Sequence, residues 1–347
     1  MALRPFDALI NARIAAMAAL VVMLAAAIAP ARAQEASPHA IDIPPWFAQS
    51  FLDFREEVAD AARDGKRVMI YVGQDGCPYC RKLMTANFSQ RDTVAKTRAG
   101  FVAIALNLWG DRETTWVDGR TASEKELARR LEVQFTPTLL FLDERGQVVV
   151  RLDGYWPPQR FDAVLDYVAS KREKTEPLTD WLARNAREAA SPKLHDETFF
   201  LPPDAMPRRK GRRPLAVLFE TTDCTACDEL HREAFRRADV LAQVARFDVV
   251  RLPLGASMPI VTPDGRATTA HAWARELGIA YTPSVVFFDD AGVEVFRIGA
   301  YLRPFHFASS FAYVADGAYR TDPSFQRWLQ ARAERMRARG ERVDLWE

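Results

Sequence analysis

The sequence predicts an α/β protein made of two tandem copies of one small sandwich domain, each with a mixed sheet flanked by helices. The chain has 347 residues, enough for two or three domains. Its 48% hydrophobic and 27% charged residues are typical of globular proteins and exclude disordered, collagen-like or coiled-coil chains. The third observation is an internal repeat at a fixed spacing, which is the signature of a duplicated unit.

The repeat matches residues that have special chemical or backbone roles. Each copy contains a Cys-x-x-Cys pair and, further along, a Thr-Pro pair. The matched residues are Cys77, Cys80, Thr136 and Pro137 in the first copy, and Cys224, Cys227, Thr282 and Pro283 in the second. The shift is 147 positions for the cysteines and 146 for the Thr-Pro pairs. Composition alone does not produce such matches, so we interpret the chain as a tandem duplication.

In each copy we expect the order strand, helix, strand, helix, strand, strand, helix. The first strand is a short apolar run, the Cys-x-x-Cys pair opens the helix that follows it, and a second apolar run gives the next strand. Ser123 and Glu126 form a capping box that starts the second helix. A turn sequence joins the last two strands into a hairpin, and an amphipathic helix closes the copy. The expected elements are 67–73, 80–88, 101–106, 123–131, 138–142, 148–152 and 158–170, and then 215–219, 227–235, 247–252, 269–277, 284–288, 293–298 and 304–317.

These elements divide the chain into five segments. They are a signal peptide (1–33), a first domain (34–171), a linker with a short helix near 181–190 (172–213), a second domain (214–320) and a charged terminal helix (321–347). The linker ends in the basic run 208–213, which we interpret as a solvated segment in preference to a site for an acidic partner. The five histidines show no metal-binding spacing, and we expect them on the surface or on helix faces.

Residues 1–33 have the pattern of a secretory signal peptide. Arg4 and Arg13 precede or flank a 16-residue apolar run (14–29), and Ala31-Arg32-Ala33 provides a cleavage site before Gln34. The alternative is an uncleaved anchor, but the run is shorter than the roughly 20 residues that span a bilayer. We therefore expect no stable membrane insertion after cleavage. Frequent Ala and Arg suggest a bacterium, so the expected location is the periplasm, where thiols meet an oxidising system.

The overall charge gives no sign of a nucleic-acid partner. Lys and Arg number 47 against 46 Asp and Glu, a net charge of +1. Loss of residues 1–33 removes three arginines and one aspartate, which changes this to −1. Such a balanced chain creates no global field for polyanions.

The cysteine pairs are the candidate catalytic groups. Residues i and i+3 of a helix share a face, so each pair can close a local disulfide. Cys77 and Cys224 lie at helix starts, where free N–H groups and the helix dipole favour a thiolate, and we expect them to attack substrate. Cys80 and Cys227 would then resolve the mixed disulfide. Pro78 suits the first turn because it has no N–H group to leave unpaired.

With a Thr-Pro pair about sixty positions after each Cys-x-x-Cys pair, the chain resembles the thioredoxin fold. The resemblance implies that Pro137 and Pro283 are cis and face the cysteines, and that Thr136 and Thr282 present backbone to an extended substrate. Pro78 and Tyr79, between the first two cysteines, would belong to the same substrate surface. Protein thiols and disulfides would be the partners, with no metal and no cofactor.

Within the superfamily, the first copy from about residue 51 to 171 resembles the periplasmic SoxW-type thioredoxins. The residues that carry this resemblance are Gly110–Glu113, Asp118–Gly119 and Gly154–Pro158. It implies a reductase of protein disulfides that a membrane electron donor keeps reduced. The second copy matches more loosely, and Tyr71 and Leu218 stand where thioredoxin proper has a proton-transferring acid.

The charges near the two pairs differ. Arg81 and Lys82 follow Cys80, whereas Asp228 and Glu229 follow Cys227. Cations favour a thiolate and anions oppose it, and a stabilised thiolate makes the disulfide a stronger oxidant. We therefore hypothesise that electrons pass from the second pair to the first.

Other interpretations of the cysteines remain open. They are structural disulfides or a zinc half-site, a disulfide oxidase or isomerase, and a non-catalytic module that carries copper(I) on its thiolates. A joint Cys₄ zinc site requires spacings far shorter than the 143 residues between the two pairs. Haem attachment requires a histidine directly after the second cysteine, where Arg81 and Asp228 stand.

Overall fold

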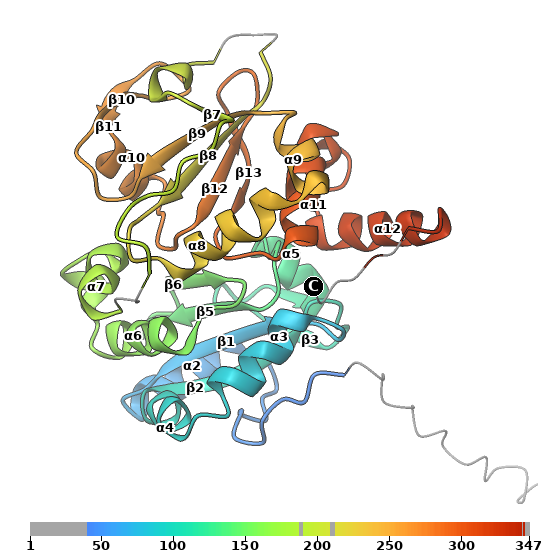
Figure 1. Cartoon of the computed structure of the whole chain (residues 1–347). Helices are drawn as coiled ribbons and strands as arrows, with labels where there is room; N and C mark the ends of the chain where they lie inside the picture. Colours follow the sequence, from blue (N-terminus) through green and yellow to red (C-terminus); the bar gives the residue numbers. More distant parts are fainter. Residues whose placement is uncertain (1–39, 187–189, 209–211, 342, 344–347) are drawn as a thin grey trace, which may run out of the picture. The chain divides into compact units, whose positions relative to one another are not determined.

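The computed structural model describes residues 40–186, 190–208, 212–341 and 343 (Figure 1). The expected signal peptide and part of the basic run lie outside these residues. Residues 41–347 form one compact unit that contains both copies of the repeat, called here the first and the second half. Within the described residues, every helix is too short or too polar to cross a membrane.

The first half contains every element that the sequence predicts, together with helices and short strands that it does not. Its sheet has the order β2-β1-β5-β6, in which β1 and β2 are parallel and the other neighbours antiparallel. Its helices are α2 (Phe54–Arg63), α3 (Pro78–Lys82) with a π-helical turn (Leu83–Asn87), α4 (Arg91–Gly100), α5 (Glu124–Arg130) and α6 (Pro158–Ala169). Its strands are β1 (Arg67–Gly73), β2 (Phe101–Asn107), β3 (Glu113–Thr115), β4 (Thr121–Ser123), β5 (Thr138–Leu142) and β6 (Val148–Asp153).

The second half repeats this arrangement and adds one strand. Its sheet has the order β13-β12-β8-β9-β7. Its strands are β7 (Phe200–Leu201), β8 (Leu215–Glu220), β9 (Asp248–Pro253), β10 (Pro259–Val261), β11 (Ala267–Thr269), β12 (Ser284–Phe288) and β13 (Glu294–Ile298). Its helices are α8 (Thr225–Arg232), α9 (Ala238–Val244), α10 (Ala270–Glu276), α11 (Pro304–Ala315) and α12 (Phe325–Ala338), with 3₁₀ turns at 203–205, 234–236 and 318–320. Between the halves lie a 3₁₀ turn (172–174) and α7 (Leu178–Asn185).

The central strand of each sheet is buried along its whole length because helices cover both faces of the sheet. In β1, Met69 and Tyr71 face the cluster under α3 and α6, whereas Val68, Ile70 and Val72 face the cluster under α2 and α5. The strand β8 divides its side chains in the same way. This pattern confirms the α/β class and the mixed sheets, since alternate residues of a strand point to opposite faces.

Three helices of the two halves were not expected from the sequence. The apolar residues of α2 recur with helical spacing at Phe54, Val58 and Ala61, a signal that was available. In α4 the buried residues are Thr93 and Thr97, so no apolar stripe marks it. The helix α9 is short, with only Val240 and Val244 buried.

The interpretation of the basic run as solvated is wrong for Arg208. Its side chain is fully buried and its Nη1 lies 2.9 Å from Oδ2 of Asp248 at the start of β9. Burial opposes ionisation of Asp248, but hydrogen bonds and charge from Arg208, and further arginines, hold its pKa below the usual value. Together with β7, which pairs with β9, this contact makes the end of the expected linker part of the second half.

Replacing Arg208 by Ala is expected to lower the free energy of unfolding by about 3 kcal/mol, because it leaves a buried carboxylate with weaker partners. The exposed Arg212, 3.2 Å from the same carboxylate, provides the control, and its replacement by Ala is expected to cost at most about 1 kcal/mol. Urea unfolding followed by circular dichroism measures both. Equal losses of unfolding free energy in the two variants would show that the Arg208 contact stabilises the protein no more than the Arg212 contact does.

Candidate active site

The first cysteine pair lies at the start of α3, directly after the buried strand β1. Cys77 is the N-cap residue and forms a disulfide with Cys80. The N–H group of Cys80 donates a hydrogen bond to Sγ of Cys77 at 3.0 Å, and Pro78 occupies the first turn as expected. The sulfur thus meets the unpaired N–H groups at the helix start, where negative charge is stabilised.

The Thr-Pro pair lies against this sulfur. The peptide bond from Thr136 to Pro137 is cis, which confirms the expectation from the resemblance. The carbonyl oxygen of Thr136 lies 3.3 Å from Sγ of Cys77, and the Thr136 hydroxyl donates a hydrogen bond to the same sulfur at 3.3 Å.

The second half has the same arrangement with one difference. Cys224 caps α8 and forms a disulfide with Cys227, whose N–H group lies 3.1 Å from Sγ of Cys224. The Thr282-Pro283 bond is also cis, and the Thr282 carbonyl oxygen lies 3.5 Å from Sγ of Cys224. The Thr282 hydroxyl, however, is buried and has no hydrogen-bond partner among the described residues. The second sulfur therefore lacks a donor that the first one has.

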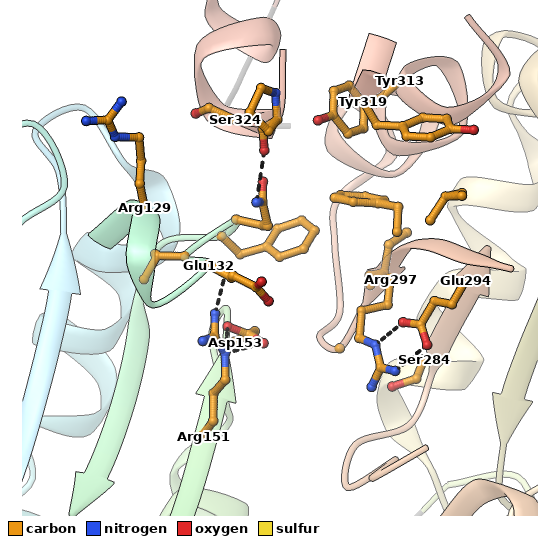
Figure 2. A pocket seen from close by; sticks show the side chains of 18 of the residues that line it. Arg129, Glu132, Arg151, Asp153, Ser284, Glu294, Arg297, Tyr313, Tyr319 and Ser324 are labelled. Atoms are coloured by element: carbon orange, nitrogen blue, oxygen red, sulfur yellow. Dashed lines mark hydrogen bonds and ion pairs between the residues drawn. The ribbon is translucent and has the colours of Figure 1, made fainter. Parts of the chain in front are cut away.

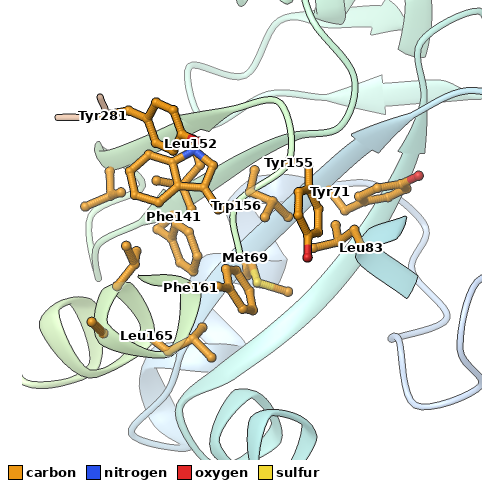
Figure 3. Close-up of a cluster of buried hydrophobic side chains, with 14 of the residues drawn as sticks. Met69, Tyr71, Leu83, Phe141, Leu152, Tyr155, Trp156, Phe161, Leu165 and Tyr281 are labelled. Carbon is orange, nitrogen blue, oxygen red and sulfur yellow. The ribbon is translucent and has the colours of Figure 1, made fainter. Parts of the chain in front are cut away.

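All four cysteines are buried, and both pairs belong to the same hydrophobic cluster. Their exposed fractions are 4% for Cys77, 0% for Cys80 and 2% for both Cys224 and Cys227. The cluster also contains Trp156 and Tyr281, which come from different halves and whose rings lie 4.9 Å apart (Figure 3). The two cysteine pairs therefore lie on one shared contact region between the halves.

The residues expected to contact substrate lie in this region. Thr136, Pro137, Thr282 and Pro283 are buried, and Pro78 is half-buried. Tyr79 is also buried: its hydroxyl accepts a hydrogen bond from the Arg303 N–H group at 2.7 Å, and its ring lies 5.4 Å from that of His306. Its burial raises the pKa of the phenol. In the first half, the expected substrate surface is therefore covered by the second half.

A chain of glutamine contacts reaches the first sulfur, and no pattern in the sequence predicted it. Gln74 donates hydrogen bonds from Nε2 to Oγ1 of Thr136 at 3.1 Å and to Oε1 of Gln326 at 2.9 Å. Gln326 lies at the start of α12 and donates to the carbonyl of Gln134 at 2.9 Å. The terminal helix, 252 residues from Gln74 in sequence, therefore holds the threonine that binds Cys77.

A buried acid–histidine group includes His231 of α8, which lies on a helix face, as one of the expected placements for the histidines, but on the buried side. His231 is 1% exposed, with Nε2 3.0 Å from Glu220 and Nδ1 2.9 Å from Glu197. Burial disfavours the imidazolium, but the two carboxylates outweigh this and raise the pKa of His231. Glu220 ends the buried strand β8, and a charged residue at the end of an apolar run was the available signal.

Asp228, next to Cys227, is held by neighbours. Its Oδ1 lies 2.6 Å from Nε2 of His195, and its Oδ2 accepts from the Ser191 N–H group at 3.0 Å. Burial opposes its ionisation, but these hydrogen bonds lower the pKa of the carboxyl. An anion therefore lies close to the second pair, as the sequence suggested.

A cavity of about 1160 Å³ lies beside this region, lined by both halves (Figure 2). Arg129, Glu132 and Arg151 line it from the first half, and Glu294 and Arg297 from the second. Among its lining residues, Trp156 and Tyr281 also belong to the cluster around the cysteines. None of the four cysteines lines it, so the cavity is not an open route to the sulfurs.

Within the described residues, no three His, Cys, Asp or Glu side chains gather as metal ligands.

Comparison with known proteins agrees with this geometry. A family model described as a thioredoxin-like domain matches residues 54–169 and again 206–315. The two matches correspond to the two halves and cover more than half of the chain. No protein of curated function matches the sequence.

Several solved structures align with about a third to two fifths of this chain. A thioredoxin-fold protein from Helicobacter pylori is 22% identical, covering 39% of this chain and 90% of that chain, with a TM-score of 0.32. A thioredoxin from Thermus thermophilus is 31% identical, covering 34% and 85%, with a TM-score of 0.28. A disulphide isomerase from Xylella fastidiosa is 15% identical, covering 38% and 99%, with a TM-score of 0.27. The family match, and not these partial alignments, carries the assignment.

Replacing Thr136 by Val is expected to lower the reduction potential of the first pair by about 10–30 mV, since a hydrogen bond is worth about 0.5–1.5 kcal/mol and the lost donor favours the Cys77 thiolate. The matched Thr282→Val change removes a hydroxyl without a partner and is expected to leave the second pair unchanged. Equilibration with glutathione followed by alkylation and mass spectrometry measures both pairs. Equal shifts in the two variants would contradict a role for the Thr136 hydroxyl.

Acid is expected to weaken the protein through His306. Burial, with a smaller effect of Arg303, lowers the pKa of His306 to about 4, whereas an unfolded histidine titrates near about 6.5. Between these values the unfolded state binds the extra proton, so stability falls as the pH falls from about 6.5 to 4. His306→Leu should make this dependence shallower, which urea unfolding at several pH values measures. His271→Leu controls for the loss of a histidine, and parallel curves for all three proteins would refute the expectation.

Proposed function

Because the chain belongs to the thioredoxin-like domain family and contains two copies of the domain, we propose that it is an exported thiol–disulfide oxidoreductase that reduces protein disulfides. One observation carries the chemistry. In each half the sulfur of a helix-capping cysteine lies within 3.5 Å of the carbonyl of the threonine before a cis proline. This arrangement holds the attacking sulfur at a helix start and leaves the second cysteine one turn further on, where it can resolve a mixed disulfide.

The reductase direction rests on the resemblance of the first half to the periplasmic SoxW-type thioredoxins. A membrane electron donor would then keep the pairs reduced. The reaction transfers two electrons: Cys77 attacks a substrate disulfide, Cys80 displaces the reduced substrate, and the enzyme disulfide forms. The donor restores the two thiols.

The proposed location rests on the pattern of residues 1–33. Positive residues, the apolar run 14–29 and the Ala-x-Ala sequence before Gln34 support export to the periplasm and removal of the segment. Cell fractionation and the intact mass of the protein test this. A periplasmic product that begins at Gln34 supports export, and a full-length cytoplasmic product contradicts it.

Reduction of insulin with dithiothreitol as electron donor tests the activity. Cys77→Ser is expected to lower the activity of the first half at least about 100-fold, because losing a covalent nucleophile removes several kcal/mol of transition-state stabilisation. An Arg98→Ala variant, which changes an exposed side chain on α4 outside both pairs, is expected to keep wild-type activity. Wild-type protein that refolds reduced ribonuclease but does not reduce insulin would favour an oxidase or isomerase instead.

A further inference from the structure

Each half places an aromatic side chain, from an equivalent position of the repeat, in the hydrophobic cluster of the other half. Phe135, two residues before Pro137, belongs to the hydrophobic cluster of the second half, with its ring 5.7 Å from Phe296 and 5.4 Å from Phe325. Tyr281, two residues before Pro283, belongs to the cluster of the first half and lies against Trp156 (Figure 3). Each Thr-Pro loop is therefore anchored in the opposite half.

The cysteine segments follow the same pattern. Cys224, Ala226 and Cys227 belong to the cluster that is otherwise built mainly from the first half, and not to the clusters of their own sheet. In return, Tyr79 of the first half is buried, and its hydroxyl accepts a hydrogen bond from the Arg303 N–H group of the second half. Close approach extends to the loops after the last strands, where a Cβ on Gly154 would lie 2.5 Å from that of Ala300. The surface that would receive a substrate on each half is occupied by the other half.

We propose that the two cysteine pairs exchange electrons directly, through a mixed disulfide between Cys224 and Cys77, with the second pair reducing the first. This inference rests on the thiol–disulfide chemistry of the proposed function and adds its internal step. The substrate of the second half is then the first half of the same chain, which covers its substrate surface in this closed arrangement.

The exchange proceeds through two thiol–disulfide displacements. The Cys224 thiolate attacks Sγ of Cys77, forming the Cys224–Cys77 bond and breaking the Cys77–Cys80 bond, with Cys80 leaving as a thiolate. The Cys227 thiolate then attacks Cys224, forming the Cys224–Cys227 disulfide and releasing Cys77 as a thiolate. Two electrons and two protons pass from the second pair to the first. An external protein dithiol reduces the second pair, and a substrate protein disulfide oxidises the first.

The direction follows from groups near the two cysteine pairs. The Thr136 hydroxyl donates to Cys77, whereas the equivalent Thr282 hydroxyl has no partner in the part of the chain that the structure describes. Asp228 directly follows Cys227 in the second pair, whereas Arg81 occupies the equivalent position after Cys80 in the first pair. Both differences stabilise the reduced form of the first pair relative to that of the second.

The Cys80→Ser/Cys227→Ser protein tests the exchange because it retains only the two attacking cysteines. Oxidation of the reduced full chain with diamide is expected to yield an internal Cys77–Cys224 disulfide, identified by mass spectrometry of the unreduced digest. An intramolecular pair has an effective concentration near mM, so at micromolar protein the internal form should exceed disulfide-linked dimers by roughly 10²–10³-fold. Circular dichroism verifies that the variant is folded.

The Cys77→Ser/Cys224→Ser protein is the matched control, since it retains two cysteines that do not attack, and it is expected to form no internal disulfide. If the folded Cys80→Ser/Cys227→Ser protein formed only disulfide-linked dimers, or no disulfide at all, the proposed exchange would be overturned. Insulin reduction by the wild type separates the two proposals. An active wild type with no internal bond in the variant leaves the proposed reductase standing, and an inactive wild type overturns the reductase itself.

The direction is tested on wild-type protein that has received one equivalent of dithiothreitol. After equilibration and alkylation, labelled Cys77 and Cys80 are expected to exceed labelled Cys224 and Cys227 several-fold. An excess of label on the second pair would reverse the direction.

Discussion

The contact between a helix-capping sulfur and the carbonyl of the threonine before a cis proline is the constraint around which each half is built. The sulfur must stand at the end of the central strand, at the start of a helix, and opposite the loop that enters the next strand. These three segments are far apart in sequence, and the buried central strand brings them together. The sheet, the covering helices and the hairpin all serve this placement.

The residues around this contact differ between the two copies. Around the first sulfur, Thr136 and Gln74 continue a hydrogen-bond chain to Gln326 on the terminal helix. Around the second, the threonine hydroxyl has no partner within the described residues, and a buried histidine of α8 contacts two carboxylates. From this shared backbone geometry with different donors and charges, we expect two sites of the same chemistry with different reduction potentials.

Burial distinguishes this arrangement from a single domain with an open site. A substrate surface is apolar because it must bind an extended chain. In this protein each half buries the apolar surface of the other. The packing of Phe135 and Tyr281 in opposite clusters is symmetric with respect to the repeat, as expected when two copies of one surface meet each other. A protein partner gains access to either sulfur only when this contact opens.

The sequence by itself determined the α/β class, the duplication, the cysteine pairs and the two Thr-Pro loops, because apolar periodicity and local turn chemistry act within a few residues. It also placed most strands within one residue of their observed ends, since buried strands such as β1 are continuous apolar runs. Only the tertiary structure decided that Arg208, His231 and His306 are buried, that Gln326 reaches the first site, and that both sulfur pairs share one cluster. These features depend on contacts between residues tens to hundreds of positions apart, where the burial of a polar group is decided by its partner and not by its own neighbours in the chain.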